Sequence, residues 1–162
     1  MPFPQRGNSV TTLTVPSVGH NSRVAPHPSD GTRPLGILIV DDEDPVRRIL
    51  GLGLQAQGFV VWLAADAMTA VELYLGHHDA IDVVLLDVRM PDRDGPETLA
   101  ALRELDPQVT CCFMSGDTGE YTQENLLDLG VVAVFQKPFR LRELARHLIE
   151  IASPIDRPVV FQ

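Results

Sequence analysis

A short apolar run that ends in an acid limits the folds open to this chain more than any other feature. Val83 to Leu86 form a continuous apolar run, which is typical of a strand buried on both faces of a parallel sheet. Asp87 follows at the point where such a strand would emerge. Open α/β sheets place their chemistry in the crevice outside the carboxyl ends of the strands. The sequence therefore predicts a buried parallel strand that presents Asp87 at a functional edge.

The same alternation repeats along the chain from Leu35 onward. Apolar runs predict strands over 37–40, 59–63, 83–86, 109–114 and 131–136. Amphipathic segments predict helices over about 44–57, from 66 to a loop at 76–79, and over about 96–105, 119–129 and 141–151. Five β-α units in succession predict an α/β fold, in which a doubly wound five-stranded parallel sheet carries five helices on its two faces.

Local signals support the first of these helices. Asp44 is placed to be its N-cap, with Pro45 at the first helical position, and Gly58 is placed to end it. Gly51 and Gly53 lie inside the helix, where each glycine costs about 1 kcal/mol of helix propensity. We therefore expect close packing against this helix at both glycines.

Length and composition indicate one folded domain with flanking segments. The chain has 162 residues, enough for one core. Residues 1–34 contain six prolines and no strand or helix periodicity, so we expect a disordered Pro-rich extension there, a domain over 35–152 and a short tail over 153–162. The sequence contains neither a long apolar run nor a secretory signal, which predicts a cytoplasmic protein without membrane association.

Charge and cysteine content limit the classes of partner. The net charge of −9 argues against direct nucleic-acid binding, because the phosphates would repel an acidic surface. Cys111 and Cys112 are adjacent inside an apolar run, so we expect buried reduced thiols. Lys137 is the only lysine among 13 basic residues, which indicates that a compact ammonium group is needed at that position.

Polar residues follow four of the predicted strands. They are Asp41 and Asp42, Asp87, Ser115 and Lys137. The carboxyl ends of parallel strands share one edge, so these side chains should converge. Three close carboxylates need a cation, and hard oxygen ligands with room for water suit Mg²⁺. Such an ion, with an ammonium and a hydroxyl group, would also suit a phosphoryl group. Taken singly, the two first acids could cap the next helix, and Ser115 could be a turn residue.

Four segments, ILIVDD, VVLLDVRMPDRDG, FMSG and FQKPF, are similar to those of the receiver domain of two-component response regulators. The resemblance covers about residues 35–151 and implies the flavodoxin-like, CheY-like receiver fold. It further implies that Asp87 is the phosphoacceptor, which takes a phosphoryl group from a phosphohistidine on a histidine kinase or a histidine phosphotransfer protein.

The resemblance also assigns roles to the other residues of the constellation. It implies that Asp42 binds Mg²⁺ directly and Asp41 through water, with Asp87 and the backbone carbonyl of Arg89 as further ligands. It implies that Ser115 and Lys137 bind the phosphoryl group.

One family feature is missing, and it concerns the output of the signal. Receivers usually carry Tyr or Phe three residues before the lysine, at a switch position that is Val134 here. Phe135 should point to the other face of its strand. The resemblance also implies that Val46, Arg47 and Leu50 meet the histidine donor. We expect a stand-alone receiver that signals by contact with a downstream protein.

Three alternatives compete with this interpretation. A phosphatase of the haloacid dehalogenase type needs a second Asp two residues after the nucleophile, where this chain has Arg89. A receiver-like binding module that is never phosphorylated would not need every acidic, hydroxyl and lysine position to be filled. A nucleotide-binding α/β protein needs a glycine-rich loop after the first strand, where residues 41–44 are acidic.

Overall fold

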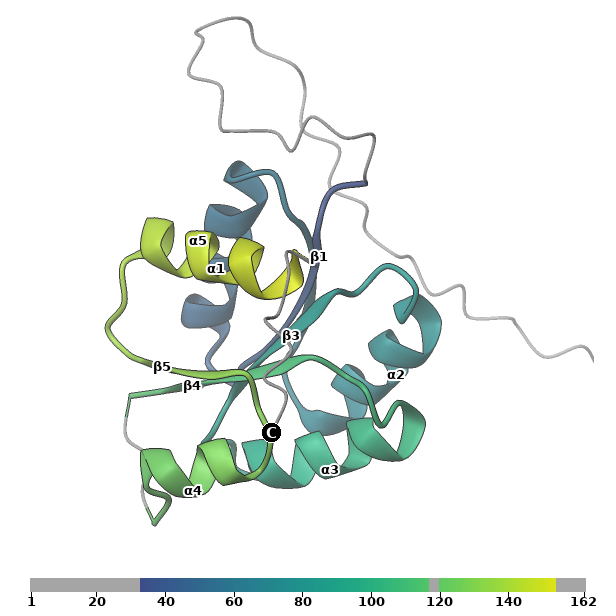
Figure 1. The fold of residues 1–162 in the computed structure, drawn as a ribbon, viewed down its shortest axis with the longest axis vertical. Helices are drawn as coiled ribbons and strands as arrows, with labels where there is room; N and C mark the ends of the chain where they lie inside the picture. Colours follow the sequence, from purple (N-terminus) through teal and green to yellow (C-terminus); the bar gives the residue numbers. More distant parts are fainter. Residues whose placement is uncertain (1–32, 117–119, 154–162) are drawn as a thin grey trace, which may run out of the picture.

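A computed structural model describes residues 33–116 and 120–153, and within them five strands alternate with five helices (Figure 1). The strands are β1 Gly36–Val40, β2 Val60–Ala64, β3 Val83–Asp87, β4 Cys111–Ser115 and β5 Ala133–Gln136. The helices are α1 Asp44–Ala56, α2 Ala67–His77, α3 Gly95–Leu105, α4 Gln123–Asp128 and α5 Leu141–Ala152. The predicted number and order of elements are thus confirmed, with strand ends displaced by one or two residues.

All five strands are parallel and form one sheet in the order β2-β1-β3-β4-β5. β1 and β3 are neighbours in this sheet, and Val40 is in register with Leu86. Asp41 directly follows Val40, and Asp87, the last residue of β3, directly follows Leu86, so the two acids lie side by side at the carboxyl edge of the sheet. The topology therefore confirms the predicted fold and brings the first acids to the edge that carries Asp87.

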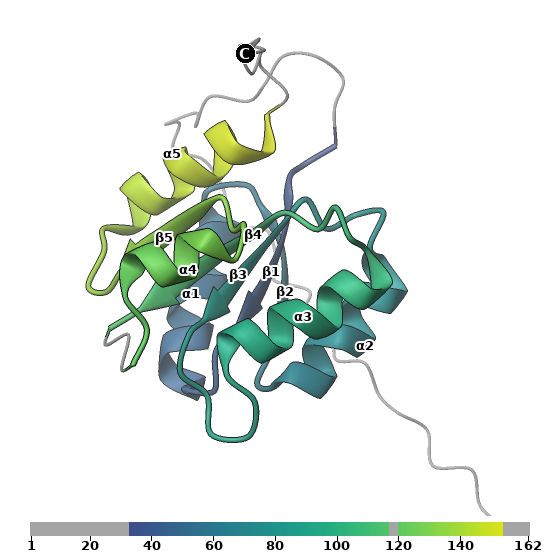
Figure 2. The same cartoon turned by 60° about the horizontal axis from the view of Figure 1, so that its bottom comes forward.

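Helices cover both faces of the sheet (Figure 2). On one face, α1 and α5 pack on a core that includes Ile37 and Ile39 of β1. On the other, α2, α3 and α4 pack on a core that includes Leu38 and Val40. The alternation of strand side chains explains this division, and the complete burial of β1 explains why its sequence is continuously apolar.

The glycines of α1 have the expected roles, but its cap differs from the prediction. A Cβ at Gly51 would lie 3.1 Å from a methyl carbon of Leu63, and one at Gly53 would overlap the side chain of Leu141. Gly58 ends the helix with a φ of +94°, a left-handed conformation that glycine adopts without strain. Asp44, predicted as the N-cap, is instead the first helical residue, because the carbonyl of Glu43 already accepts a hydrogen bond from the backbone of Arg47.

The helix before β5 is shorter than predicted. The expected span was 119–129, whereas α4 comprises Gln123–Asp128 and residue 119 lies outside the described residues. Thr122 is its N-cap and accepts a hydrogen bond from the Asn125 backbone, while the Asn125 side chain accepts one from the Thr122 backbone. This reciprocal cap favours a helix start at residue 123.

The two thiols lie inside the sheet, as predicted. Cys111 and Cys112 are both buried and free. Burial raises the pKa of both thiols, to about 12 for Cys112, so neither forms a thiolate near neutral pH.

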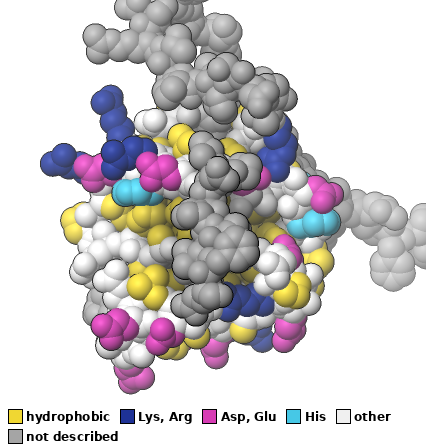
Figure 3. Space-filling view, viewed as in Figure 1, with side chains coloured by type: hydrophobic (Ala, Val, Ile, Leu, Met, Phe, Trp, Pro, Cys, Tyr) yellow, Lys and Arg dark blue, Asp and Glu magenta, His cyan; other side chains and the backbone are white. Residues whose placement is uncertain are grey.

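Charged residues gather on the outer face of α5, where Figure 3 shows basic and acidic side chains close together. Arg146 and Glu150 form an exposed ion pair there, 3.9 Å apart, and Leu144 and Leu148 occupy the buried side of the helix. In the described part of the chain, no helix is long and apolar enough to span a membrane.

Arg33 fixes the chain at the amino edge of the sheet, opposite the edge that carries Asp87. The guanidinium of Arg33 makes two 2.9 Å contacts with the carboxylate of Asp82 and donates to the carbonyls of Asp79 and Ala80. Asp82 also accepts a 2.7 Å hydrogen bond from the backbone of Gly36, at the start of β1. Apart from residues 33 and 34, the extension predicted over 1–34 lies outside the described residues, as does the tail after residue 153.

A hydrogen bond between two helices of one layer provides a test of the packing. Tyr74 on α2 donates its hydroxyl to Asp106 at the end of α3, 2.7 Å away. Burial, together with this bond and the carboxylate charge, raises the pKa of Tyr74. The same bond is the main reason why the pKa of Asp106 is lowered.

We expect Tyr74→Phe to lower the free energy of unfolding by about 1 kcal/mol at neutral pH, the usual contribution of one hydrogen bond. A lowered folded pKa means that the carboxylate stabilises the fold above the ordinary aspartate pKa of about 4 and loses this effect as pH falls through its folded pKa. The difference between wild type and variant, measured by urea denaturation, should therefore shrink below about pH 4. An undiminished difference at low pH would contradict this assignment.

Candidate functional site

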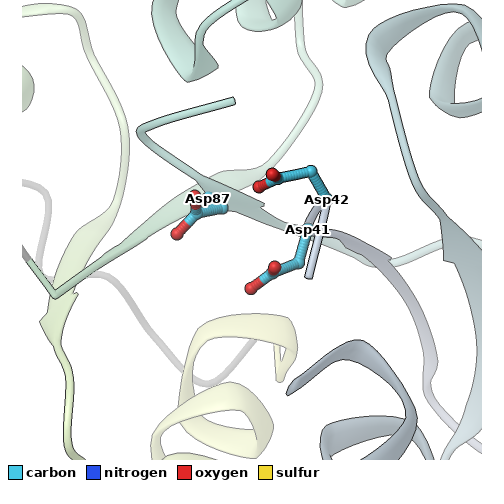
Figure 4. A group of neighbouring side chains, drawn as sticks. All are labelled: Asp41, Asp42 and Asp87. Carbon is cyan, nitrogen blue, oxygen red and sulfur yellow. The ribbon is translucent and has the colours of Figure 1, made fainter. Parts of the chain in front are cut away.

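Three carboxylates meet at the carboxyl edge of the sheet (Figure 4). Asp41 and Asp42 follow β1 directly, and Asp87 is the last residue of β3. One oxygen of each carboxylate lies within 4.8 Å of the others. The convergence predicted from the strand ends is therefore present in the structure.

Lys137 lies between two of the three carboxylates. Its ammonium nitrogen is 2.9 Å from Asp41 Oδ2 and 2.9 Å from Asp87 Oδ1. The backbone N–H of Lys137 donates to the carbonyl of Ser115, which ties the end of β5 to the end of β4. The lysine thus supplies the cation that such a cluster needs.

Asp41 is held on every side and has no exposed surface. One carboxylate oxygen accepts from the backbone of Glu43, and the other accepts from Lys137. Its backbone N–H donates to Ala64 of β2, and its carbonyl accepts from Arg47 of α1. Asp41 thus has a hydrogen bond at each of its polar groups, and it anchors the turn that leads to Asp42, the exposed member of the cluster.

Burial and charge act in opposite directions on Asp87 and Lys137. Burial raises the pKa of Asp87 and the Asp41 charge adds to this, while Lys137 opposes the increase. Burial lowers the pKa of Lys137, but its hydrogen bonds to the two carboxylates and their charges outweigh burial, so that pKa is raised. The lysine therefore stays protonated, while the charged form of Asp87 is disfavoured.

Ser115 ends β4 beside β3, and its hydroxyl is the unsatisfied polar group of the site. Its side-chain oxygen is buried and has no hydrogen-bond partner among the described residues. A buried hydroxyl without a partner costs about 1–3 kcal/mol. In the described part of the chain, the fold therefore leaves this hydroxyl available at the edge that carries the carboxylates.

The loop after β3 folds back tightly against the end of its strand. The Gly95 backbone donates to the carbonyl of Val88, and a Cβ at Gly95 would lie 2.7 Å from the Asp87 carbonyl. Asp94 caps α3 and also accepts a 2.7 Å hydrogen bond from the hydroxyl of Tyr121, just before α4. Sequence reasoning predicted the turn but missed the Tyr121 bond, which joins segments far apart in sequence.

The backbone N–H of Arg89 contacts Asp87 Oδ2 at 3.2 Å, so this backbone lies beside the cluster. On β5, Val134 and Phe135 face opposite layers, as predicted. Val134 packs with the core under α2 to α4, together with Tyr121, whereas Phe135 packs on the α1 and α5 side and its ring contacts His147.

Two of the residues expected to meet a histidine donor are oriented differently. Leu50 is only 6% exposed and belongs to the core, so the expectation that it contacts a partner is wrong. The Arg47 side chain is only 13% exposed and reaches back to the end of β1. Its place three residues after Asp44 allows the ion pair that orients it, but no sequence pattern indicated the contact with Asp41.

The family model of the response regulator receiver domain matches residues 37–149. The chain belongs to this family. The receiver domain is a phosphoacceptor module of two-component signalling, so the match favours this function over the phosphatase and nucleotide-binding alternatives.

Curated relatives place similar sequences in longer signalling proteins. The chain is 34% identical over 120 residues to the sensor kinase CckA of Brucella abortus, covering 74% of this chain and 13% of that protein. It is 39% identical over 108 residues to the regulatory protein AtoC of Escherichia coli, covering 67% of this chain and 23% of that protein. The chain thus spans less than a quarter of either relative.

Solved structures agree with the fold. The structure of the CheX-CheY-BeF3-Mg²⁺ complex from Borrelia burgdorferi matches with a TM-score of 0.68 and 28% identity, over 75% of this chain and 91% of that one. The receiver domain of the hybrid histidine kinase CckA matches with a TM-score of 0.61 and 30% identity, over 73% of this chain and 99% of that one.

The electrostatics of this receiver lead to a test on stability. We expect Asp87→Asn to raise the free energy of unfolding at neutral pH without divalent cations, because a neutral amide removes the cost of a buried charge. An increase of about 0.5–2 kcal/mol is usual for a stabilising substitution. An acid whose folded pKa is raised destabilises the fold as pH rises from its ordinary value of about 4 through its folded pKa. The gain should therefore disappear below about pH 4.

Urea denaturation of both proteins in EDTA across this pH range would measure the effect. Asp42→Asn is the matched control, because Asp42 is exposed and should change stability little. Lower stability of Asp87→Asn at neutral pH would contradict the expected cost of the buried charge.

Proposed function

We propose that Asp87 is the phosphoacceptor of this receiver and that a phosphohistidine of a histidine kinase or phosphotransfer protein is the donor. The observation that carries the proposal is the position of Asp87, which ends the central strand β3 beside two further carboxylates and is bound by Lys137. Membership of the receiver family supports the same role.

In the proposed reaction, a carboxylate oxygen of Asp87 attacks phosphorus. An O–P bond forms, the P–N bond to the histidine breaks, and its electron pair leaves with the imidazole nitrogen. Lys137, which pairs with Asp87 before the reaction, is placed to pair with an oxygen of the transferred group. The unsatisfied hydroxyl of Ser115 is a donor for another such oxygen.

The acidic cluster fits a divalent cation. Three carboxylates with oxygens within 4.8 Å supply the hard ligands that Mg²⁺ prefers. Asp42 and Asp87, with the Arg89 carbonyl, would hold the ion directly and Asp41 would hold it through water. When bound, Mg²⁺ would neutralise charge on the incoming phosphoryl group. The Borrelia CheY complex, which contains BeF3 and Mg²⁺, supports this assignment.

We further propose that the phosphorylated receiver signals by contact with another protein. The Borrelia relative is in complex with CheX, which supports contact with a protein partner. An unphosphorylated binding module remains the second candidate function, and the following experiment separates the two.

Incubation with MgCl2 and acetyl phosphate should add one labile phosphoryl group to the wild-type protein, as measured by intact mass. Asp87→Ala should gain none, because the attacking carboxylate is absent. Asp42→Ala should react much more slowly and with little dependence on MgCl2. The exposed Arg48→Met is the matched control and should react like wild type.

A phosphoryl group on Asp87→Ala would contradict the assignment of the acceptor. If neither acetyl phosphate nor a purified phosphotransfer protein modifies the wild type, the unphosphorylated binding module becomes the better conclusion.

The valine at the switch position leads to a second prediction. Val134 lacks the ring that receivers usually carry there, so we expect phosphorylation to change amide exchange in α4, β5 and α5 only weakly. Val134→Tyr should enlarge this change. Hydrogen exchange of both proteins before and after phosphorylation tests it, and a large change in the wild type would contradict it.

A further inference from the structure

Arg47 is turned toward the acidic cluster rather than toward solvent. Its Nη1 donates to the backbone carbonyl of Asp41 at 2.7 Å, and its Nη2 contacts Asp44 Oδ1 at 2.7 Å. Its backbone N–H also donates to the carbonyl of Glu43. The first turn of α1 is thereby tied to the residue that leaves β1.

The neighbouring arginine shows that pairing with Asp44 does not by itself require this orientation. Arg48 contacts the other oxygen of Asp44 at 2.9 Å, yet its side chain is 72% exposed, compared with 13% for Arg47. The contact with the Asp41 carbonyl distinguishes the two side chains.

The Asp41 carbonyl belongs to the planar peptide unit that leads to Asp42. A hydrogen bond that fixes this oxygen therefore fixes the plane from which the Asp42 backbone starts. The carboxylate of Asp41 is held separately, by Lys137 and Glu43. Arg47 thus acts on the direction of Asp42, the exposed ligand candidate, rather than on the carboxylate of Asp41.

We propose that Arg47 is a positioning residue for the Mg²⁺ site, holding the Asp41–Asp42 peptide so that the Asp42 carboxylate is preorganised. This inference rests on the proposed function. Charge alone has the opposite effect, because a guanidinium near three carboxylates repels a divalent cation. Removing Arg47 therefore weakens Mg²⁺ binding if position dominates and strengthens it if charge dominates.

The test is titration of the unphosphorylated full chain with MgCl2 by isothermal titration calorimetry. We expect Arg47→Met to weaken binding about tenfold, the lower end of the effect of residues that orient metal ligands. Arg47→Lys keeps the charge but cannot contact both Asp41 and Asp44, so it should bind Mg²⁺ more weakly than the wild-type protein. Arg48→Met removes the same charge and another contact with Asp44, and it should bind like wild type.

A second measurement distinguishes a misplaced Mg²⁺ ligand from a general loss of structure. The rate of phosphorylation by acetyl phosphate, measured against MgCl2 concentration, should reach the wild-type maximum in Arg47→Met but need about tenfold more MgCl2. Thermal melting reports whether each variant is folded. If Arg47→Met does not fold, Arg47→Lys is the test of the positioning role of Arg47. Weakened Mg²⁺ binding by Arg47→Lys supports this role, and Mg²⁺ binding as tight as that of the wild type overturns it.

Three outcomes overturn the inference in distinguishable ways. Arg47→Met that binds Mg²⁺ as tightly as wild type, or more tightly, overturns the role of Arg47 alone. Arg48→Met that is weakened equally shows that the ion pairs of Asp44, rather than the contact with the Asp41 carbonyl, control the site, because loss of charge alone would strengthen binding. A wild type without Mg²⁺ binding, or with binding unaffected by Asp42→Ala, overturns the proposed metal site together with the inference.

Discussion

One ammonium group between two carboxylates is the interaction on which the functional edge of this fold depends. Lys137 reaches Asp41 across 96 residues of sequence and Asp87 across 50, at 2.9 Å in both cases. It neutralises part of a cluster whose charges would otherwise repel one another. It also binds the ends of three strands together, because Lys137 follows β5 and its partners lie at the ends of β1 and β3.

The rest of the site is arranged around groups that this lysine does not satisfy. The hydroxyl of Ser115 is buried without a partner among residues 33–116 and 120–153, and burial raises the pKa of Asp87 even beside an ammonium. Such costs persist only where the surrounding sheet and helices are stable enough to compensate. Unsatisfied and charged groups concentrated at one edge are typical of a site prepared for a ligand that completes it.

Most of the fold could be predicted because it depends on periodicity. Continuous apolar runs indicated buried parallel strands, and the parallel arrangement was sufficient to predict that Asp41, Asp87 and Lys137 share one edge of the sheet. Element ends were less predictable. Asp44 resembled an N-cap, but the carbonyl of Glu43 accepts the first helical hydrogen bond, from the backbone of Arg47, and Asp44 pairs with two arginines inside the helix.

Long-range side-chain contacts could not be predicted from local pattern. The bonds from Arg47 to the Asp41 carbonyl and from Tyr121 to Asp94 depend on how the loops fold over the sheet edge, which no periodicity encodes. The prediction that Leu50 of α1 contacts a partner was wrong for a related reason. Leu50 lies on the buried stripe of its helix, and only the packing against the sheet shows which stripe that is.

The Arg33 clamp has a consequence for how this receiver can be connected to other parts of a protein. It joins the chain to Asp82 and to the carbonyls after α2, beside the amino end of β1 and β3. Asp87 lies at the carboxyl end of the same sheet. Arg33 therefore fixes the chain at the side of the domain opposite the phosphoacceptor candidate, so the point of attachment and the proposed reaction lie at opposite edges of one sheet.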